Sequence, residues 1–183
     1  MNILFYVFII YLILIIISPI RYIYVLPTLC IYPDNEKEVL EIEKEIKLRN
    51  QHDIDFFHLT DKSVSPAFTS IVPLSIKEID DMITQFHVVF IISFFKYFIN
   101  RPRPKQIKTN LDVLNSISAN TPAYPAGHAF QAYFLAKHLG KTYPELQSQL
   151  DAIAERCNSV RIKAGLHYPS DGDFSKQLVN IFY

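Results

Sequence analysis

The feature that most constrains this chain is a continuous apolar run near its start. Residues 3–20 read ILFYVFIIYLILIIISPI, which is about the length that a helix needs to cross a bilayer. A cleaved signal peptide is the alternative, but Met1-Asn2 supplies no basic side chain and no Ala-x-Ala-like cleavage site follows. We therefore expect an uncleaved, single-pass membrane anchor. Arg21, the only cation close to the run, favours a cytoplasmic position for the rest of the chain.

The remaining composition is that of one folded domain. The 183 residues are 50% hydrophobic and 14% aromatic, which supplies enough side chains for a core. Basic and acidic residues balance at 18 each, so the basic excess typical of a nucleic-acid-binding protein is absent. Cys30 and Cys157 form neither a CxxC pair nor a zinc-binding spacing. We expect an anchor at residues 1–22, a linker at 23–33 and a helical domain at 34–183.

Helical signals begin directly after the linker. Asp34 or Asn35 is placed to cap a helix that runs from Glu36 to about Phe57. Residues 61–74 contain turn formers and two prolines, which indicate a loop.

A second helical stretch is predicted from Ile76 to about Ile99. Ser75 and Glu78 have the spacing of a capping box at its start. Its later part, FHVVFIISFFKYFI, is apolar on all sides, which fits a buried core helix better than a short membrane span. Pro102 and the proline after Arg103 end the helix.

The last third of the chain is also helical in pattern. After a loop at 105–123, we expect a helix at 127–139 with Gly140 as its C-cap. Further helices are expected at 144–164 and 174–182. Because no segment shows a strand pattern, the predicted fold is all-α, a compact helical bundle preceded by the membrane-anchor helix.

One histidine and one carboxylate have the spacing of an activated nucleophile. His167 and Asp171 are four residues apart just beyond a helix end, so one turn can place the carboxylate on Nδ1 of the ring. That contact fixes the tautomer and leaves Nε2 free to attack phosphorus. We predict that His167 is the nucleophile and that Asp171 orients it.

The groups that handle a phosphate are predicted in two other segments. Gly127 and His128 open a helix, where free N–H groups bind an anion and the imidazole can protonate a departing oxygen. Lys96, Arg103 and Arg161 supply three cations, enough to neutralise a phosphoryl group without magnesium. We therefore predict no metal and no cofactor. Arg101 fits no position of this pattern and is predicted to be a surface residue or a secondary phosphate contact. The remaining four histidines are interpreted as structural.

These segments resemble the signature of the type 2 phosphatidic acid phosphatase superfamily, which includes bacterial class A acid phosphatases and vanadium haloperoxidases. Its pattern is Lys-x6-Arg-Pro, then Pro-Ser-Gly-His, then Ser-Arg-x5-His-x3-Asp. Matching positions, over about residues 60–175, are Lys96, Arg103, Pro104, Pro125, Gly127, His128, Arg161, His167 and Asp171. The resemblance implies a helical bundle, a phosphohistidine on His167, His128 as general acid, and inhibition by vanadate. Ala126 and Val160 depart from the pattern, since each stands where the superfamily has serine.

The leading hypothesis is a metal-independent phosphomonoesterase, acting on soluble or lipid phosphates, that is tethered to a membrane through residues 3–20. Loss of the serine hydroxyl at Ala126 removes one phosphate donor, which can cost ~1–3 kcal/mol. A catalytically weakened, membrane-tethered phosphate-binding or structural protein is therefore the alternative. A vanadium-dependent haloperoxidase on the same scaffold is a third, and the chain is short for that branch.

Overall fold

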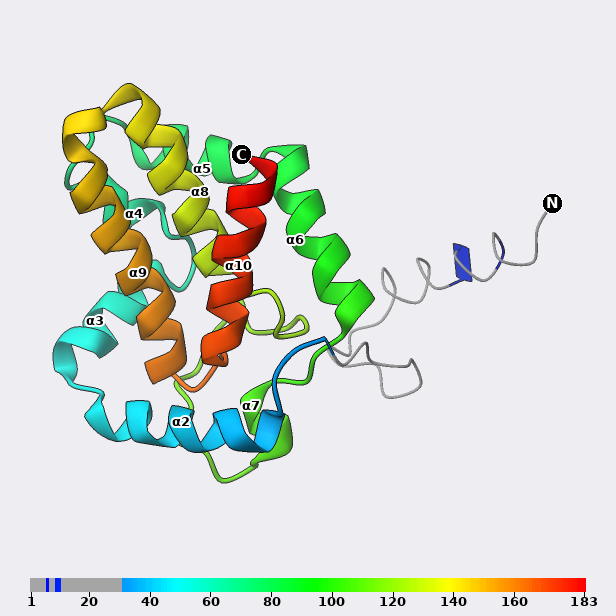
Figure 1. Cartoon of the computed structure of the whole chain (residues 1–183). Helices are drawn as coiled ribbons and strands as arrows, with labels where there is room; N and C mark the ends of the chain where they lie inside the picture. The colour runs from blue at the N-terminus through cyan, green and yellow to red at the C-terminus, as the bar shows by residue number, and fades with distance from the viewer. Residues whose placement is uncertain (1–5, 7–8, 11–30) are drawn as a thin grey trace.

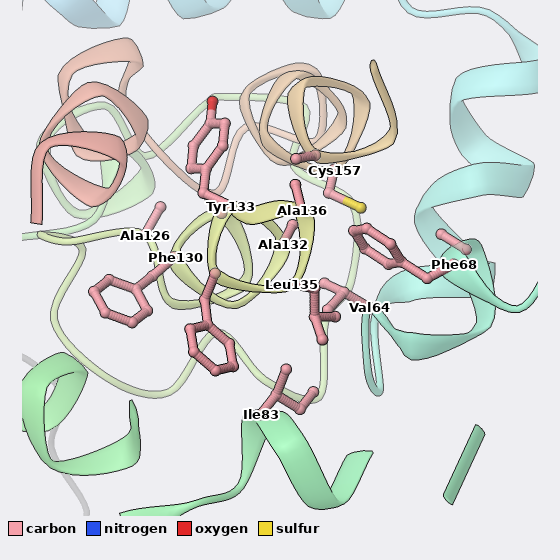
Figure 2. Close-up of a cluster of buried hydrophobic side chains, with 14 of the residues drawn as sticks. Val64, Phe68, Ile83, Ala126, Phe130, Ala132, Tyr133, Leu135, Ala136 and Cys157 are labelled. Carbon is pink, nitrogen blue, oxygen red and sulfur yellow. The ribbon is translucent and has the colours of Figure 1, made fainter. Parts of the chain in front are cut away.

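Helix α8 (Gly127–Thr142) lies at the centre of a helical bundle in the computed structural model, which describes residues 6, 9–10 and 31–183 (Figure 1). Helices α5, α6, α9 and α10 contact it. Ala129, Phe130 and Leu135 of α8 have no solvent exposure. Figure 2 shows core side chains packed around this helix, which it views close to end-on. Every regular element of the described residues is helical, so the prediction of an all-α bundle is confirmed.

The other helices surround α8 and close one end of the bundle. Their bounds are α2 Asn35–Leu48, α3 Gln51–Thr60, α4 Ser65–Phe68, α5 Ile76–Ile83, α6 Phe86–Ile99, α7 Pro104–Ile107, the 3-10 turn η1 Pro144–Leu146, α9 Gln147–Lys163 and α10 Pro169–Phe182. The last turns of α6 and α9 and the first turns of α8 and α10 meet at the end of the bundle that α2 crosses (Figure 1). The predicted site residues belong to these turns and to the segments that follow them.

The single helix predicted from Glu36 to Phe57 is wrong, because two helices occupy this stretch. Asp34 caps α2 as expected, but the chain turns extended at Arg49. The side chain of Asn50 then accepts from the backbone of Asp53, and Asp53 caps Asn50 in return. A strong local cap inside the periodic stretch therefore starts a new helix, α3.

The helix predicted over 76–99 is also divided. Ser75 and Glu78 form the expected capping box, but α5 ends at Ile83 and α6 begins at Phe86. The side chain of Thr84 donates to the carbonyl oxygen of Asp80 at 2.7 Å, at the point where the helix axis bends. In the predicted loop at 61–74, residues Ser65–Phe68 form the one-turn helix α4, with a proline in its first turn.

Helix α6 is not the fully buried core helix that its composition predicts. Only one face is buried, and it carries Val88, Ile92, Lys96 and Ile99. The opposite face is exposed and is rich in phenylalanine. Asn100 ends the helix in a left-handed conformation with φ of 54°, and the two prolines follow it.

Gly140 does not cap α8, which continues to Thr142. A Cβ on Gly140 would lie 1.7 Å from the side-chain oxygen of Gln147, so this glycine makes room for the side chain of α9. Gly165, in contrast, ends α9 with φ of 75°, close to the predicted position. Helix α10 begins at Pro169, several residues before the predicted start.

Most of the predicted anchor at residues 3–20 and most of the linker at 23–33 lie outside the described residues. In the part of the chain that is described, no single helix has the length and apolarity to cross a bilayer. Helix α5 together with the stretch Phe86–Ile107 meets the same criteria of length and composition, with a bend of 53° between them.

Candidate active site

The predicted site residues meet around one pocket of about 190 Å³. Six of the seven line it: Lys96, Arg103, Gly127, His128, Arg161 and His167. The seventh, Asp171, is completely buried directly behind His167. Three segments that are far apart in the sequence thus come together at one end of the bundle.

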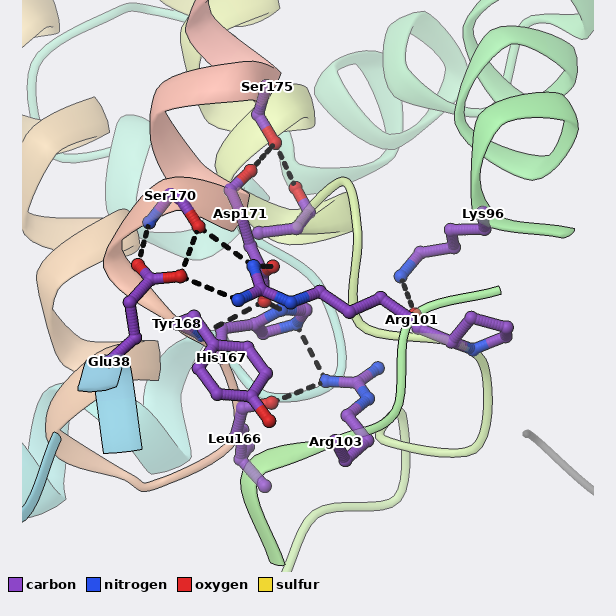
Figure 3. Close-up of polar contacts among 12 residues, drawn as sticks. Glu38, Lys96, Arg101, Arg103, Leu166, His167, Tyr168, Ser170, Asp171 and Ser175 are labelled. Carbon is purple, nitrogen blue, oxygen red and sulfur yellow. Dashed lines mark hydrogen bonds and ion pairs between the residues drawn. The ribbon is translucent and has the colours of Figure 1, made fainter. Parts of the chain in front are cut away.

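His167 follows the turn that ends α9, and both of its ring nitrogens have partners (Figure 3). Nδ1 lies 2.9 Å from Oδ2 of Asp171, and Nε2 lies 2.8 Å from Nη1 of Arg103. A carboxylate only accepts and a guanidinium only donates, so these contacts assign the proton to Nδ1 and a lone pair to Nε2. Burial lowers the pKa of His167 well below 6.5, and nearby Arg103 and Lys96 lower it further. The ring is therefore neutral, and its Nε2 accepts from Arg103, which lines the pocket together with His167.

The Asp171 carboxylate is held by three donors. Oδ2 accepts from His167 and from the backbone N–H of Tyr168, each at 2.9 Å, and Oδ1 accepts from Arg101 at 2.7 Å. Burial raises the pKa of Asp171, whereas the guanidinium of Arg101 opposes that rise. Arg101 thus favours the charged carboxylate that fixes the tautomer of His167.

Arg101 is not at the surface and lines no part of the pocket, so this prediction is wrong. Its side chain is completely buried between Asp171 and Glu38, with ion pairs of 2.7 and 2.6 Å. Its guanidinium carbon also lies 3.8 Å from the ring centre of Tyr168 and 4.5 Å from that of Tyr32. These contacts make Arg101 a positioning residue behind the site.

Glu38 of α2 is a further residue that the sequence does not single out. Its two oxygens accept from the backbone N–H of Ser170 at 2.9 Å and from the hydroxyl of Ser170 at 2.6 Å, besides pairing with Arg101. The sequence places Glu38 in a charged stretch that reads as a solvated helix face. No spacing relates it to Asp171, so only the folded chain brings the two together.

Arg161 at the end of α9 is held by another acidic residue that the sequence does not reveal. Its Nη1 lies 2.8 Å from Oδ1 of Asp61, and its Nη2 donates to Ser116 and Ser118. Burial acts to raise the pKa of Asp61, but hydrogen bonds from Ser116 and Arg161 outweigh it and lower that pKa below 3.8. The buried Nε of Arg161 has no hydrogen-bond partner within the described residues, which leaves a donor for an anion.

His128 in the first turn of α8 also contacts Asp61. Its Nε2 lies 3.1 Å from the backbone carbonyl oxygen, which can only accept, so Nε2 carries a proton. Burial lowers the pKa of His128 to about 3, and the charge of Arg161 adds to this effect. The imidazole is therefore neutral until a negative charge enters the pocket.

Lys96 reaches the pocket from the buried face of α6. Its ammonium donates to the carbonyl oxygen of Pro122 at 2.5 Å. Burial lowers the pKa of Lys96 well below 10.5, and Arg103 lowers it further. Arg103 itself donates to the carbonyl oxygens of Thr121 and Leu166 at 2.9 and 2.8 Å, which fixes its side chain beside His167. Two buried cations side by side are stabilised by an anion between them.

The first turn of α8 points its backbone into the same pocket. Gly127 lines the pocket, and no side chain caps the helix at Ala126. The amides of this turn therefore lack a capping side chain and can donate to an anion. Ala126 has no solvent exposure and belongs to the hydrophobic core, as does Val160. The core thus accommodates both departures from the superfamily pattern.

The four histidines interpreted as structural are all exposed and line no part of this pocket: His52, His58, His87 and His138. Among the described residues, no group of three or more histidine, cysteine, aspartate or glutamate side chains is placed to hold a metal ion.

No protein-family model matches this chain, and no curated protein matches it in sequence.

Proposed function

We propose that this chain is a metal-independent phosphomonoesterase that acts through a phosphohistidine on His167, as its resemblance to the type 2 phosphatidic acid phosphatases implies. One observation carries the proposal. Lys96, Arg103, His128, Arg161 and His167 line one small pocket, and Asp171 on Nδ1 of His167 leaves the lone pair on Nε2, which accepts from Arg103.

Substrate binding in this proposal is electrostatic. The phosphoryl oxygens lie among Arg103, Arg161 and Lys96, while the first-turn amides of α8 donate to the same group. The unpaired Nε of Arg161 supplies one further donor. Arg103 now donates to Nε2 of His167, so it must exchange this contact for a phosphate oxygen before the ring can attack.

The reaction then proceeds in two displacements. Nε2 of His167 forms a bond to phosphorus as the bond from phosphorus to the ester oxygen breaks, and His128 gives a proton to the departing oxygen. Asp171 stabilises the positive charge that develops on the His167 ring. In the second step a water molecule attacks phosphorus, His128 takes its proton, and the bond between nitrogen and phosphorus breaks to release phosphate.

The low pKa of His128 is compatible with this role only because the substrate is an anion. Burial and Arg161 keep the ring neutral in the pocket by itself. A bound phosphate adds negative charge beside the ring and raises its pKa, so substrate binding takes up the proton that catalysis later transfers.

The substrate class is a phosphomonoester, and the same chemistry serves a soluble phosphate or a lipid phosphate. We propose that residues 3–20 tether the domain to a membrane, with the pocket on the cytoplasmic side. Vanadate, which resembles phosphate in charge and shape, is expected to bind in the pocket and inhibit.

The test is hydrolysis of p-nitrophenyl phosphate by the full chain in detergent, with EDTA present and with or without vanadate. We expect turnover that resists EDTA, is inhibited by vanadate and disappears in His167→Ala. The matched control is His138→Ala, since His138 is exposed and outside the pocket. Full activity in folded His167→Ala would contradict the proposal.

The second candidate function is phosphate binding without turnover, and Ala126 favours it. The alanine stands at the N-cap of α8, where the superfamily pattern has a serine hydroxyl beside the phosphate. Vanadate binding by calorimetry, with no hydrolysis by the wild type and recovery of hydrolysis in Ala126→Ser, would support this second function.

A further inference from the structure

The outer face of α6 carries four phenylalanines in a row: Phe86, Phe90, Phe94 and Phe98, which are 81%, 53%, 44% and 50% exposed. Successive rings stack with their centres 5.6, 6.0 and 5.5 Å apart, so they form one continuous strip. Val89 extends this surface with 43% exposure. Apolar patches of this kind on a protein surface mark sites of contact with a protein or a membrane.

No charged side chain on the strip opposes its contact with lipid. Lys96 is the only side chain of α6 with a formal charge, and it is buried on the opposite face. The 14 residues of α6 extend about 21 Å, which is less than the roughly 30 Å of a bilayer core. A helix that is short, apolar on its outer face and packed on its inner face is suited to lie along a membrane surface.

The place of α6 beside the N-terminal part of the chain supports the same partner. Arg101, just beyond the end of α6, donates to the side chain of Asn35 at 2.9 Å and to the carbonyl oxygen of Pro33 at 3.4 Å. The apolar run ends at residue 20, so only about a dozen residues separate it from this contact. A segment of that length reaches at most ~40 Å. A bilayer that holds residues 3–20 is therefore within reach of the strip.

We propose that the phenylalanine strip of α6 lies in the interfacial layer of the bilayer that holds residues 3–20. The strip then fixes the orientation of the domain, which a tether alone leaves free to rotate. Val89 and Ser93 of the same helix line the pocket, so the pocket opens beside the lipid head groups. This proposal rests on the proposed tether at residues 3–20 but requires no catalytic activity.

The experiment places a fluorescent probe on the strip of the full chain. Phe90→Cys is made in a Cys30→Ser background, labelled with the environment-sensitive dye NBD, and reconstituted into phosphatidylcholine and phosphatidylglycerol vesicles. Cys157 is 1% exposed and should not react with the dye. Leu48→Cys on α2, at a site that is 65% exposed, is the matched control.

We expect lipids that carry a nitroxide near the head group to quench the dye at position 90 several-fold more strongly than the dye at position 48. Equal lipid quenching at the two sites would overturn the proposal. So would a dye at position 90 that is shielded from water but untouched by the nitroxide lipids, because protein would then cover the strip. Dilution with excess lipid then tests whether a second copy of the chain covers the strip. The shielding is lost on dilution if a second copy provides it, because the copies separate, and remains if it comes from the same chain.

Discussion

At the residue scale, Arg101 favours the charged form of the Asp171 carboxylate and holds it in place. Arg101→Met leaves Asp171 and Glu38 buried without their cation, which typically costs about 3–5 kcal/mol of folding free energy. Without the opposing guanidinium, the pKa of Asp171 rises further. The acid limb of kcat/KM against pH should then move to higher pH in the folded fraction, and Arg101→Lys should partly restore it. A large loss of kcat with an unmoved pH profile would indicate that Arg101 has only a structural role.

Glu38, an acid that the sequence does not single out, provides a separate prediction. Glu38→Gln is the control for Arg101, because it removes one carboxylate charge while the contact of 2.7 Å between Arg101 and Asp171 remains. We expect its pH profile to stay close to that of the wild type, with a loss of stability. The measurements are urea unfolding and p-nitrophenyl phosphate hydrolysis between pH 4 and 8.

Ala126, buried next to the pocket residue Gly127, is a position at which this chain departs from the superfamily pattern that it resembles. Ala126→Ser places a hydroxyl at the N-cap of α8, where it can donate to a phosphate oxygen or accept from the first-turn amides. We expect equal or higher kcat and a gain of about 1 kcal/mol in stability, as for other N-cap serines. A clear loss of activity in a stable variant would show that the buried site around Ala126 does not tolerate the hydroxyl.

At the scale of elements, the turn after α9 positions His167, the proposed nucleophile. Gly165 donates to the carbonyl oxygen of Ile162 and Leu166 to that of Arg161, which together form a Schellman motif. Gly165 has φ of 75°, and a Cβ there would lie 2.9 Å from a methyl group of Val113. Gly165→Ala should therefore destabilise the protein by roughly 1–3 kcal/mol and lower kcat by misplacing His167. Gly127→Ala is the comparison for backbone strain, since its added Cβ would have 3.5 Å to its nearest neighbour. Equal stability of Gly165→Ala and the wild type would contradict this account.

The elements also show which parts of the fold the sequence could predict. Helix ends with a local cap, such as Ser75 with Glu78 or Gly165, were found because the signal lies in adjacent residues. The break at Asn50 was missed because helical periodicity continues through it. The exposed face of α6 was missed because apolar composition alone does not say what a helix packs against. The role of Gly140 depends on Gln147 of the next helix, which no local pattern reports.

The same division applies to the pocket. The residues in and directly behind the pocket could be predicted because a fixed interval, such as that from His167 to Asp171, corresponds to one helical turn. Glu38 and Asp61 could not, because each supports the site from outside the pocket through a contact across 60 residues or more of chain: Arg101 to Glu38, and Arg161 to Asp61. These supporting contacts depend on how the helices pack, and the spacing of residues along the sequence does not reveal them.

At the scale of the whole molecule, neutral buried histidines make folding depend on pH. The pKa of His128 is about 3 in the folded chain and 6.5 in the ordinary case, so the unfolded state binds more protons between these values. The stability that the neutral His128 contributes is thus fully present above pH 6.5 and is lost as the pH falls. Between pH 6.5 and 5 this group alone should lower the free energy of unfolding by about 2 kcal/mol. His128→Gln should not show this loss. Urea unfolding at both pH values measures this, with exposed His138→Gln as the control expected to lose stability as the wild type does.

An anion in the pocket should reverse this dependence, because it couples binding, protonation and folding. Vanadate at about 100 times its Kd should add ~2.7 kcal/mol of stability, which raises Tm by roughly 5–10 °C in a protein of this size. Its charge raises the pKa of His128 and of Lys96, which burial lowers in both cases. Calorimetry at pH 7 in two buffers of different ionisation enthalpy should therefore show net proton uptake. Arg161→Gln should lose both effects, whereas Lys163→Gln, whose partner is Asp53 outside the pocket, should keep them. Equal stabilisation of these two variants would mean that the anion binds elsewhere, since only Arg161 lies where the cations, the imidazoles and the α8 amides converge.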